Sequence, residues 1–220
     1  KIDKVGSYTF TVKARNAKGE AAQRFTLRVG SKIALTPPMG WNSWNVFGGG
    51  VTEEKVKAAA DAMVASGLAD HGWCYVNIDD FWQNRPGEQA DKTLMGPARA
   101  ADGTINPNAR FPSMKGLADY IHAKGLRVGL YSSPGPTTCG GCVGSWMHEF
   151  QDAKTYADWG FDYLKYDWCS YGRVALGSGL DRARLPYQIM GQALRAQNRD
   201  ILFSLCQYGM DNVSCWGETV

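Results

Sequence analysis

From Pro37 to Gly209 the sequence repeats one pattern, in which a short apolar stretch is followed by a segment with helical spacing. The apolar stretches are residues 37–44, 74–80, 126–133, 161–171 and 201–209. Strands that alternate with helices form a parallel sheet, because each helix returns the chain to the edge at which the next strand starts. The pattern therefore predicts an α/β fold.

The helical segments carry ordinary boundary signals. Thr52 is a good N-cap residue, and Glu53 and Glu54 follow it at the positive end of the helix dipole. One face of this helix is apolar, with Val56, Ala60, Met63 and Val64. Three further helices are predicted, over residues 114–125, 146–160 and 184–200. Pro186 lies near the start of the last one, where proline is tolerated.

Two parallel architectures fit this alternation: a doubly wound open sheet, and an eight-stranded β/α TIM-type barrel of which about five strands are present. The glycines of Gly48–Gly50 only weakly resemble the GxGxxG loop of a doubly wound dinucleotide site. Polar or aromatic residues instead follow every strand, namely Trp41, Trp44, Asp79, Asp80, Tyr131, Lys165, Asp167, Cys206 and Gln207. Barrel enzymes build their sites at that end, so the incomplete barrel is favoured.

Residues 7–29 alternate apolar and polar positions on both sides of the turn sequence NAKGE, which predicts a β-hairpin. Two strands alone do not form a stable sheet. We therefore expect residues 1–30 to be the C-terminal strands of an immunoglobulin-like β-sandwich, and residues 31–220 to be the N-terminal part of the barrel.

Composition argues against two function classes. The net charge is +3 without a block of Lys or Arg, so we expect no nucleic-acid partner. No apolar run approaches the roughly 18 residues that span a bilayer, and the first residues do not form a signal peptide. We expect any targeting segment to precede them. The eight Trp, ten Tyr and eight Phe suit either a core or a sugar-binding pocket.

The six cysteines permit disulfides without proving them. The CGGC motif, Cys139 to Cys142, is compatible with a redox pair or with half of a zinc site. No second CxxC follows, and we expect no metal. His122 and His148 fall on predicted helices, where we interpret both as surface or packing residues.

Lys165, Asp167 and Cys169 lie two residues apart in a predicted strand, so they share one face or continue it. A nearby ammonium would keep Asp167 ionised, which suits a nucleophile or a base. A buried structural ion pair between Lys165 and Asp167 is the alternative. Asp79 and Asp80 could likewise only cap the loop that follows them.

Five motifs resemble those of the α-galactosidases of glycoside hydrolase family twenty-seven: LTPPMGWNSWNVF, YVNIDDFW, AKGLRVGLYSSPGPTTCGG, ADWGFDYLKYDWC and LCQYG. The resemblance covers residues 33–220. It implies an eight-stranded β/α barrel followed by a small β-sandwich. It also implies removal of terminal α-linked galactose with retention of configuration, from a galactoside, an oligosaccharide or a polysaccharide, without a cofactor. We expect a secreted or periplasmic protein.

The resemblance also implies roles for the charged residues. By position, Asp167 is the catalytic nucleophile and Lys165 contacts sugar hydroxyls. Asp79 and Asp80 bind the 4- and 6-hydroxyls of galactose.

The resemblance also implies that the remaining site residues surround the sugar pocket. Trp44 packs on the sugar and Tyr131 lines the pocket. Cys206 and Gln207 contact the 2-hydroxyl side, and Gln207 stands where many relatives have Glu. Cys139 pairs with Cys169, which ties two loops around the mouth of the barrel.

The implied reaction has two steps. Asp167 attacks the anomeric carbon, and a second carboxyl about 5 Å away acts first as an acid and then as a base. In the family this residue follows strand six, and neither Asp211 nor Glu218 matches its motif. We therefore expect a fragment that lacks the acid/base and strands six to eight, and that has negligible turnover by itself.

Three alternatives stay open. An α-N-acetylgalactosaminidase would need small residues where Gln207 and Tyr208 stand, and a β-L-arabinopyranosidase tends to alter the acidic pair, here Asp79 and Asp80. A non-catalytic galactose-binding barrel would also use these residues.

Overall fold

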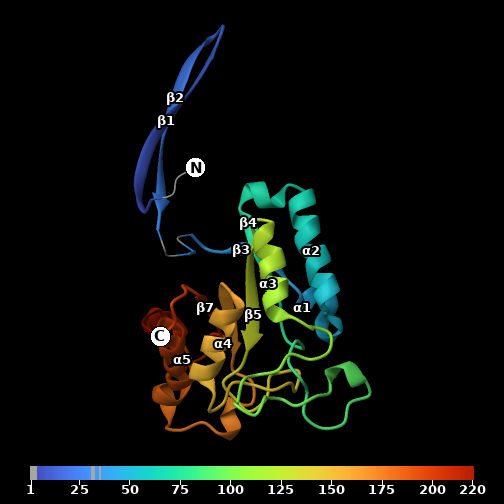
Figure 1. Ribbon diagram of the computed structural model, residues 1–220. Coiled ribbons are helices and arrows are strands. Elements are labelled where there is room, and N and C mark those ends of the chain that lie inside the picture. The colour runs from blue at the N-terminus through green and yellow to red at the C-terminus, as the bar shows by residue number, and fades with distance from the viewer. Residues whose placement is uncertain (1–3, 31–32, 35) are drawn as a thin grey trace. The chain divides into compact units, whose positions relative to one another are not determined.

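The computed structural model of the protein describes residues 4–30, 33–34 and 36–220. The chain divides into two compact units, residues 1–35 and residues 36–220 (Figure 1).

The first unit is a β-hairpin, as the alternation predicts. Strand β1 (Gly6–Asn16) pairs antiparallel with β2 (Gly19–Val29), and two residues join them. The Asn16 side chain accepts the backbone N–H of Lys18 at 2.8 Å, which stabilises this turn.

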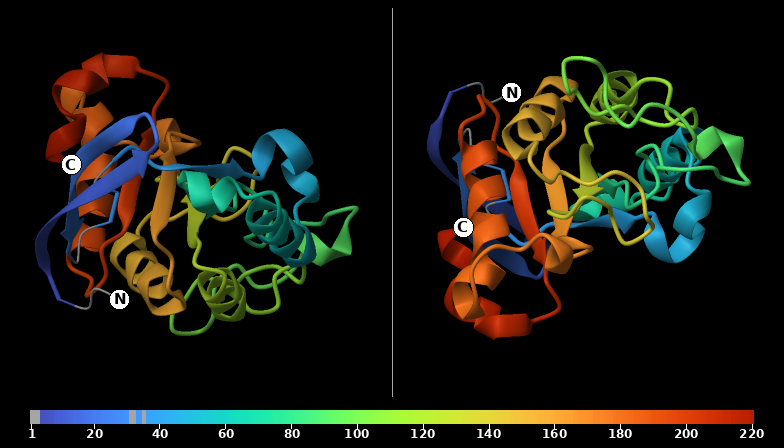
Figure 2. Two further views of the ribbon diagram at one scale, coloured as in Figure 1. Left: turned by 90° about the horizontal axis from the view of Figure 1, so that it is seen from above. Right: turned by 90° about the horizontal axis from the view of Figure 1, so that it is seen from below.

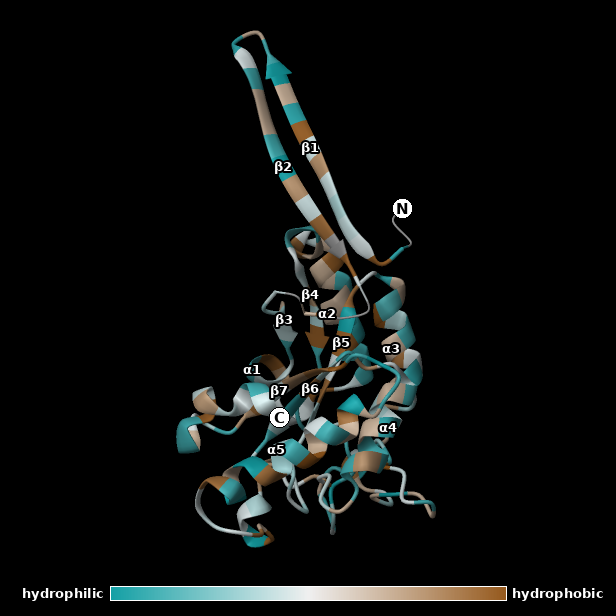
Figure 3. Cartoon of the chain, turned by 90° about the vertical axis from the view of Figure 1, so that its left-hand side faces the viewer, coloured by the Kyte–Doolittle hydropathy of each residue, from teal (hydrophilic) through white to brown (hydrophobic). Residues whose placement is uncertain are grey.

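Apolar and polar residues alternate along both strands of the hairpin (Figure 3). The rings of Phe10 and Phe25 stack across the pair with centroids 5.6 Å apart. Phe10, Val12, Phe25 and Leu27 nevertheless stay 44–52% exposed. The hairpin therefore presents an apolar face that its own two strands leave open.

The second unit is built on a parallel sheet. Within the described residues its five strands are β3 (Met39–Asn42), β4 (Trp73–Asn77), β5 (Arg127–Ser132), β6 (Tyr163–Asp167) and β7 (Leu202–Cys206). They neighbour one another in sequence order, and all four pairs are parallel. A doubly wound sheet would reverse this order at its centre. The unreversed order, with the curl of the sheet in Figure 2, confirms the incomplete barrel.

Helices surround the outside of the curled sheet (Figure 2). They are α1 (Trp44–Phe47), α2 (Glu53–Ala65), α3 (Met114–Ala123), α4 (Glu149–Trp159) and α5 (Gly179–Arg195). Short 3₁₀ turns lie at Gly48–Gly50, Leu68–His71, Lys92–Leu94, Tyr171–Arg173, Met210–Cys215 and Gly217–Thr219. The strands thus point their carboxyl ends at one set of loops, where a barrel places its site.

Local signals fix some helix boundaries and not others. The Thr52 side chain accepts the N–H of Lys55 at 3.3 Å, which confirms the predicted N-cap of α2. The prediction that Val64 shares the buried face is wrong, since it is 43% exposed. The prediction for Pro186 is also wrong, because α5 starts at Gly179 and Pro186 lies inside it. Burial of the helix face that carries Pro186 and Tyr187 outweighs the lost backbone hydrogen bond.

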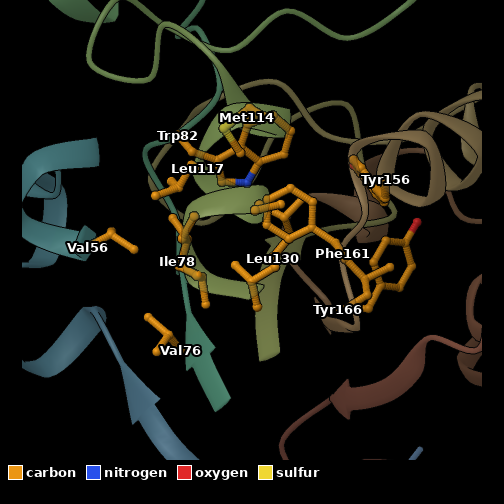
Figure 4. Packing of buried hydrophobic residues seen from close by; sticks show 14 of the residues in the cluster. Val56, Val76, Ile78, Trp82, Met114, Leu117, Leu130, Tyr156, Phe161 and Tyr166 are labelled. Carbon is orange, nitrogen blue, oxygen red and sulfur yellow. The ribbon is translucent and has the colours of Figure 1, made fainter. Parts of the chain in front are cut away.

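The core fills the space between the sheet and its helices. Figure 4 shows Val56 of α2, Leu117 of α3 and Tyr156 of α4 directed toward Leu130 of the sheet. Trp82 is fully buried among them, and its Nε1–H donates to the carbonyl of Tyr131 at 2.9 Å. The core thereby holds the loop after β4 against β5.

At the amino end of β6, Asp162 links three strands, a histidine and an arginine. Its Oδ2 lies 2.7 Å from Nε2 of His122 and accepts the N–H of Val128 at 3.0 Å, and its Oδ1 accepts from Arg199 at 2.5 Å. Its backbone N–H and C=O also bond β5 and β7. His122, interpreted from the sequence as a packing or surface residue, is half-buried and serves this cluster.

We expect the variant Asp162→Asn to be less stable by about 1.5–3 kcal/mol at neutral pH, because it loses hydrogen bonds to charged partners. Burial raises the pKa of the Asp162 carboxyl, but the bonds from His122 and Val128 and the charge of Arg199 outweigh burial and lower it. A lowered pKa stabilises the fold above about pH 4 and ceases to do so as the pH falls through the folded-state value. Thermal melts of both proteins should therefore converge below pH 4, and a gap that stays constant down to pH 3 would contradict this account.

Candidate active site

Lys165 and Asp79 form an ion pair at the carboxyl ends of β6 and β4. Nζ of Lys165 lies 2.8 Å from Oδ2 of Asp79, which is 3% exposed. The backbone N–H of Asp79 donates to the Ser43 hydroxyl at 2.9 Å. This bond links the segment after β4 to the segment after β3 and so holds Asp79 in place. Burial lowers the pKa of Lys165, but the hydrogen bond and charge of Asp79 outweigh burial and raise it.

This contact corrects the interpretation of Lys165. The alternative of an ion pair between Lys165 and Asp167 is wrong, because the ammonium bonds Asp79 across the barrel mouth instead. Sequence spacing placed Lys165 and Asp167 on one face, but it carried no information on a partner from another strand.

Asp80 is bound by the loop that follows β5. Its Oδ1 accepts the Thr138 hydroxyl at 2.7 Å, and its Oδ2 accepts the N–H of Gly140 at 2.6 Å. A Cβ at position 140 would lie 2.9 Å from that same oxygen, so the close approach requires glycine. Burial raises the pKa of Asp80, against the effect of these hydrogen bonds.

The acidic pair also caps its own loop in part. Oδ1 of Asp79 accepts the N–H of Asp80 at 2.9 Å, and Oδ1 of Asp80 accepts the N–H of Phe81 at 2.8 Å. Strand β4 has ended at Asn77, so the two neighbouring acids are free of strand alternation. Both are buried, and each reaches a different neighbouring strand or loop.

Asp167 ends strand β6 and is 5% exposed. Its Oδ1 accepts the N–H of Trp168 at 2.8 Å and the hydroxyl of Tyr208. Its Oδ2 accepts the Tyr131 hydroxyl at 3.3 Å. Neutral donors, rather than a directly bonded ammonium, therefore hold this carboxylate in place.

The disulfide between Cys139 and Cys169, implied by the resemblance, is present and has a Cα–Cα distance of 5.0 Å. It joins the loop after β5 to the loop after β6. The Tyr208 hydroxyl lies 3.6 Å from the sulfur of Cys139 and 3.7 Å from that of Cys169. Atoms of both cysteines and Asp167 lie within 4.8 Å of one another, but the bonded sulfurs offer no thiolate to a metal.

Trp44 and Gln207 contact the other site residues less directly. Trp44 is 42% exposed and stacks on Phe81, the residue after Asp80, with ring centroids 6.4 Å apart. Gln207 is 3% exposed and donates to the carbonyl of Met210 at 2.7 Å. Among the described residues nothing bonds its buried Oε1.

One site residue, Tyr208, was missed by sequence reasoning, which considered it only for its bulk. Cys206 was assigned through the resemblance to the 2-hydroxyl side of the sugar. Cys206 pairs in register with Asp167 on the neighbouring strand. Burial, then the charge of Asp167, raises the pKa of the Cys206 thiol to about 11. The available signal for Tyr208 was its position directly after Gln207 at the carboxyl end of β7.

The remaining sequence candidates lie outside this network. Cys142 is buried and unpaired, and burial raises its pKa to about 12, which suits neither a redox pair nor a zinc ligand. Nδ1 of His148 lies 3.3 Å from the amide oxygen of Gln151 at the start of α4. In the described part of the chain, no helix has the length and apolar character needed to cross a membrane.

One chain of contacts joins the polar strand ends. Lys165 bonds Asp79 at 2.8 Å and lies 5.1 Å over the ring of Tyr131, and Tyr131 bonds Asp167. Tyr208 then connects Asp167 to the disulfide. Such a set offers a buried carboxylate beside a cation, hydroxyls and aromatic rings, which are the groups that bind and attack a sugar.

Comparison with known proteins agrees with this arrangement. A family model described as Alpha galactosidase A matches residues 36–215. Alpha-galactosidase A of Cellvibrio japonicus is 44% identical over 202 residues, which cover 91% of this chain and 44% of that protein. The crystal structure of alpha-galactosidase I from Mortierella vinacea has a TM-score of 0.76 and 39% identity, and the match covers 87% of this chain and 45% of that one.

A structure of the alpha-galactosidase from Saccharomyces cerevisiae with raffinose has a TM-score of 0.74 and 34% identity, with coverage of 84% of this chain and 38% of that one. The chain thus spans about half the length of the curated relatives that it matches, 44% in the case of the Cellvibrio protein. Since the family model covers most of the barrel unit and all five strands that carry the site, this chain belongs to the Alpha galactosidase A family of glycoside hydrolase family twenty-seven.

Proposed function

We propose that the whole protein is a retaining α-galactosidase and that Asp167 is its nucleophile. The observation that carries this proposal is the environment of Asp167: a carboxylate that is 5% exposed, aimed by three donors, at the carboxyl end of a central barrel strand. A nucleophile must be anionic and held at one angle to the anomeric carbon. The donors to Asp167 meet the second requirement, because they hold the carboxyl group in one orientation.

In the first step an oxygen of Asp167 forms a bond to the anomeric carbon while the bond to the leaving oxygen breaks. An acid must protonate that leaving oxygen, and the same group later activates water. We assign this role to neither Asp79 nor Asp80. Asp79 already bonds an ammonium, and both oxygens of Asp80 accept hydrogen bonds from protein donors.

We propose galactose as the sugar because both acids of the pair, Asp79 and Asp80, are present and are held in place by hydrogen bonds from neighbouring residues. Asp79, Asp80 and Lys165 supply acceptors and a donor for neighbouring sugar hydroxyl groups, and Trp44 supplies an apolar face next to them. The likeness to the yeast enzyme solved with raffinose supports an α-galactosyl oligosaccharide as substrate. We place Gln207 in the site only through its position after β7.

The test compares three chromogenic substrates with the whole protein: p-nitrophenyl α-galactoside, α-N-acetylgalactosaminide and β-L-arabinopyranoside. We expect the α-galactoside to be hydrolysed at least about tenfold faster in kcat/KM than the others, since lost or blocked hydroxyl contacts cost at least 1.4 kcal/mol. Proton NMR should show α-galactose as the first product. Release of β-galactose first, or a preference for another sugar, would overturn the proposal.

Two further assignments rest on less direct observations. We infer a secreted or periplasmic location, since a disulfide persists in oxidising compartments. We also propose that the hairpin of residues 1–30 belongs to an immunoglobulin-like β-sandwich. The 44–52% exposure of its apolar residues supports this, because a second sheet would cover them.

A further inference from the structure

We propose that Tyr208 is a positioning residue for the nucleophile: its hydroxyl holds Oδ1 of Asp167 and stabilises the carboxylate each time that group leaves the sugar. This inference rests on the proposed glycosidase function. It assigns to Tyr208 an action on the reaction through Asp167, and no contact with the sugar is required.

The contacts of the Tyr208 hydroxyl carry the argument. It donates to Oδ1 of Asp167, and it lies 3.6 Å and 3.7 Å from the two sulfurs of the Cys139–Cys169 disulfide. The Tyr208 residue as a whole is 63% exposed, so the ring lies at the surface while its tip reaches a carboxylate that is 5% exposed. Hydrophobic burial of the ring therefore does not explain this placement.

The backbone at Tyr208 has an unfavourable conformation in the structure that brings its hydroxyl to Asp167. Its φ is 63°, a left-handed value that costs a residue with a side chain roughly 1 kcal/mol or more. Gly209 follows with a φ of 74°, so the two residues together turn the chain back over the end of β6. The hydrogen bond from the Tyr208 hydroxyl to the Asp167 carboxylate offsets this strain, since a bond to an ionised acceptor is stronger than one between neutral groups.

The two oxygens of Asp167 are bonded unequally. Oδ1 accepts from Trp168 at 2.8 Å and from Tyr208, whereas Oδ2 accepts the Tyr131 hydroxyl at the longer distance of 3.3 Å. The Cys206 thiol is a further hydrogen-bond partner of this carboxylate. Oδ2 is less strongly hydrogen-bonded than Oδ1, so we infer that Oδ2 is the oxygen whose lone pair attacks the anomeric carbon. When water later displaces Asp167 from that carbon, the carboxylate regains its charge, and the Tyr208 donor stabilises the departing group.

Other ionisable groups surround Asp167 and must be considered. They are Tyr131 on β5, Lys165 on β6, Tyr187 on α5 and Cys206 on β7. All of them remain in the variant Tyr208→Phe, which removes one oxygen atom. Any change in the ionisation of the site in that variant is therefore due to the lost donor.

The experiment measures the pH dependence of kcat/KM on p-nitrophenyl α-galactoside for the whole protein and for Tyr208→Phe. Loss of a donor to a carboxylate should move the acid limb of the profile upward by about one pH unit. The control is Tyr120→Phe, which removes a hydroxyl that donates to the exposed Asp61 at 2.8 Å, remote in the fold. We expect no shift of the limb in that control.

A second measurement does not depend on turnover. Burial, then the bond to Asp167, raises the pKa of the Tyr208 phenol. In carbon-13 tyrosine spectra this resonance, assigned by its loss in Tyr208→Phe, should titrate above pH 10 and move down in Asp167→Asn. An active protein with an unshifted acid limb and an unchanged Tyr208 titration would overturn the inference alone. A protein that does not cleave the galactoside would overturn the proposed function and the inference with it.

Discussion

Replacing Asp167 by asparagine should abolish turnover of p-nitrophenyl α-galactoside by the whole protein, with a fall in kcat of at least about a thousandfold. The amide has nearly the same shape as the carboxylate, and an amide oxygen in the place of Oδ1 can still accept from Trp168 and Tyr208. It carries no charge, however, and its oxygen is too weak a nucleophile to displace the p-nitrophenolate leaving group. The substrate should therefore bind while the first covalent bond fails to form.

Two further variants make this result interpretable. Asp158→Asn changes the same chemical group in an exposed pair with Lys154, and it should leave activity unchanged. Asp167→Gly should regain activity in sodium azide and yield β-galactosyl azide, because the small anion enters the vacated space and attacks from the same face. Activity of Asp167→Asn within tenfold of the parent would place the nucleophile elsewhere.

Replacing Asp152 by asparagine should lower the stability of the barrel by about 3–5 kcal/mol, the cost of leaving a buried charge without its partner. Asp152 is fully buried on α4, and Arg99 bonds it in a bidentate manner at 2.5 and 2.9 Å. The same guanidinium donates to the carbonyls of Gly103 and Gly144. One ion pair thereby holds the loops after β4 and β5, which carry the acidic pair and the disulfide.

The urea midpoint of the whole protein measures this effect. The matched control is Asp119→Asn, which breaks a 59–61% exposed pair with Lys115 and should cost less than about 0.5 kcal/mol. The double variant Arg99→Met/Asp152→Leu should recover part of the loss, because it removes both buried charges together. If Asp152→Asn and Asp119→Asn shift the midpoint equally, the buried pair has no special role.

The fold followed from periodicity to a large extent. Alternating strand and helix patterns located the sheet, and Thr52 located the start of α2, because a cap is a contact between residues three apart. The start of helix α5 was not predicted correctly. The proline rule placed Pro186 near a first turn, whereas packing of Tyr187 and its neighbours extends the helix back to Gly179.

The partners within the site could not be predicted in the same way. Spacing put Lys165 and Asp167 on one face of a strand, but Lys165 bonds Asp79, which lies 86 residues earlier. Tyr208 reaches Asp167 only because the backbone turns left-handed at its own position. Neither contact corresponds to a periodic pattern of residues in the sequence, so periodicity could not predict it.

By itself the sequence determined the alternation of strands and helices, the parallel direction of the strands, the chemical groups at their ends and, through motif resemblance, the cysteines that pair. Those features depend on residues that are neighbours along the chain or on motifs read as a set. Only the tertiary structure decided which oxygen of Asp167 is restrained, which carboxylate neutralises Lys165 and that the Gln207 amide bonds its own loop. The physical reason is that a hydrogen bond requires heavy atoms within about 3 Å of each other, and curvature of the sheet sets those distances between strands.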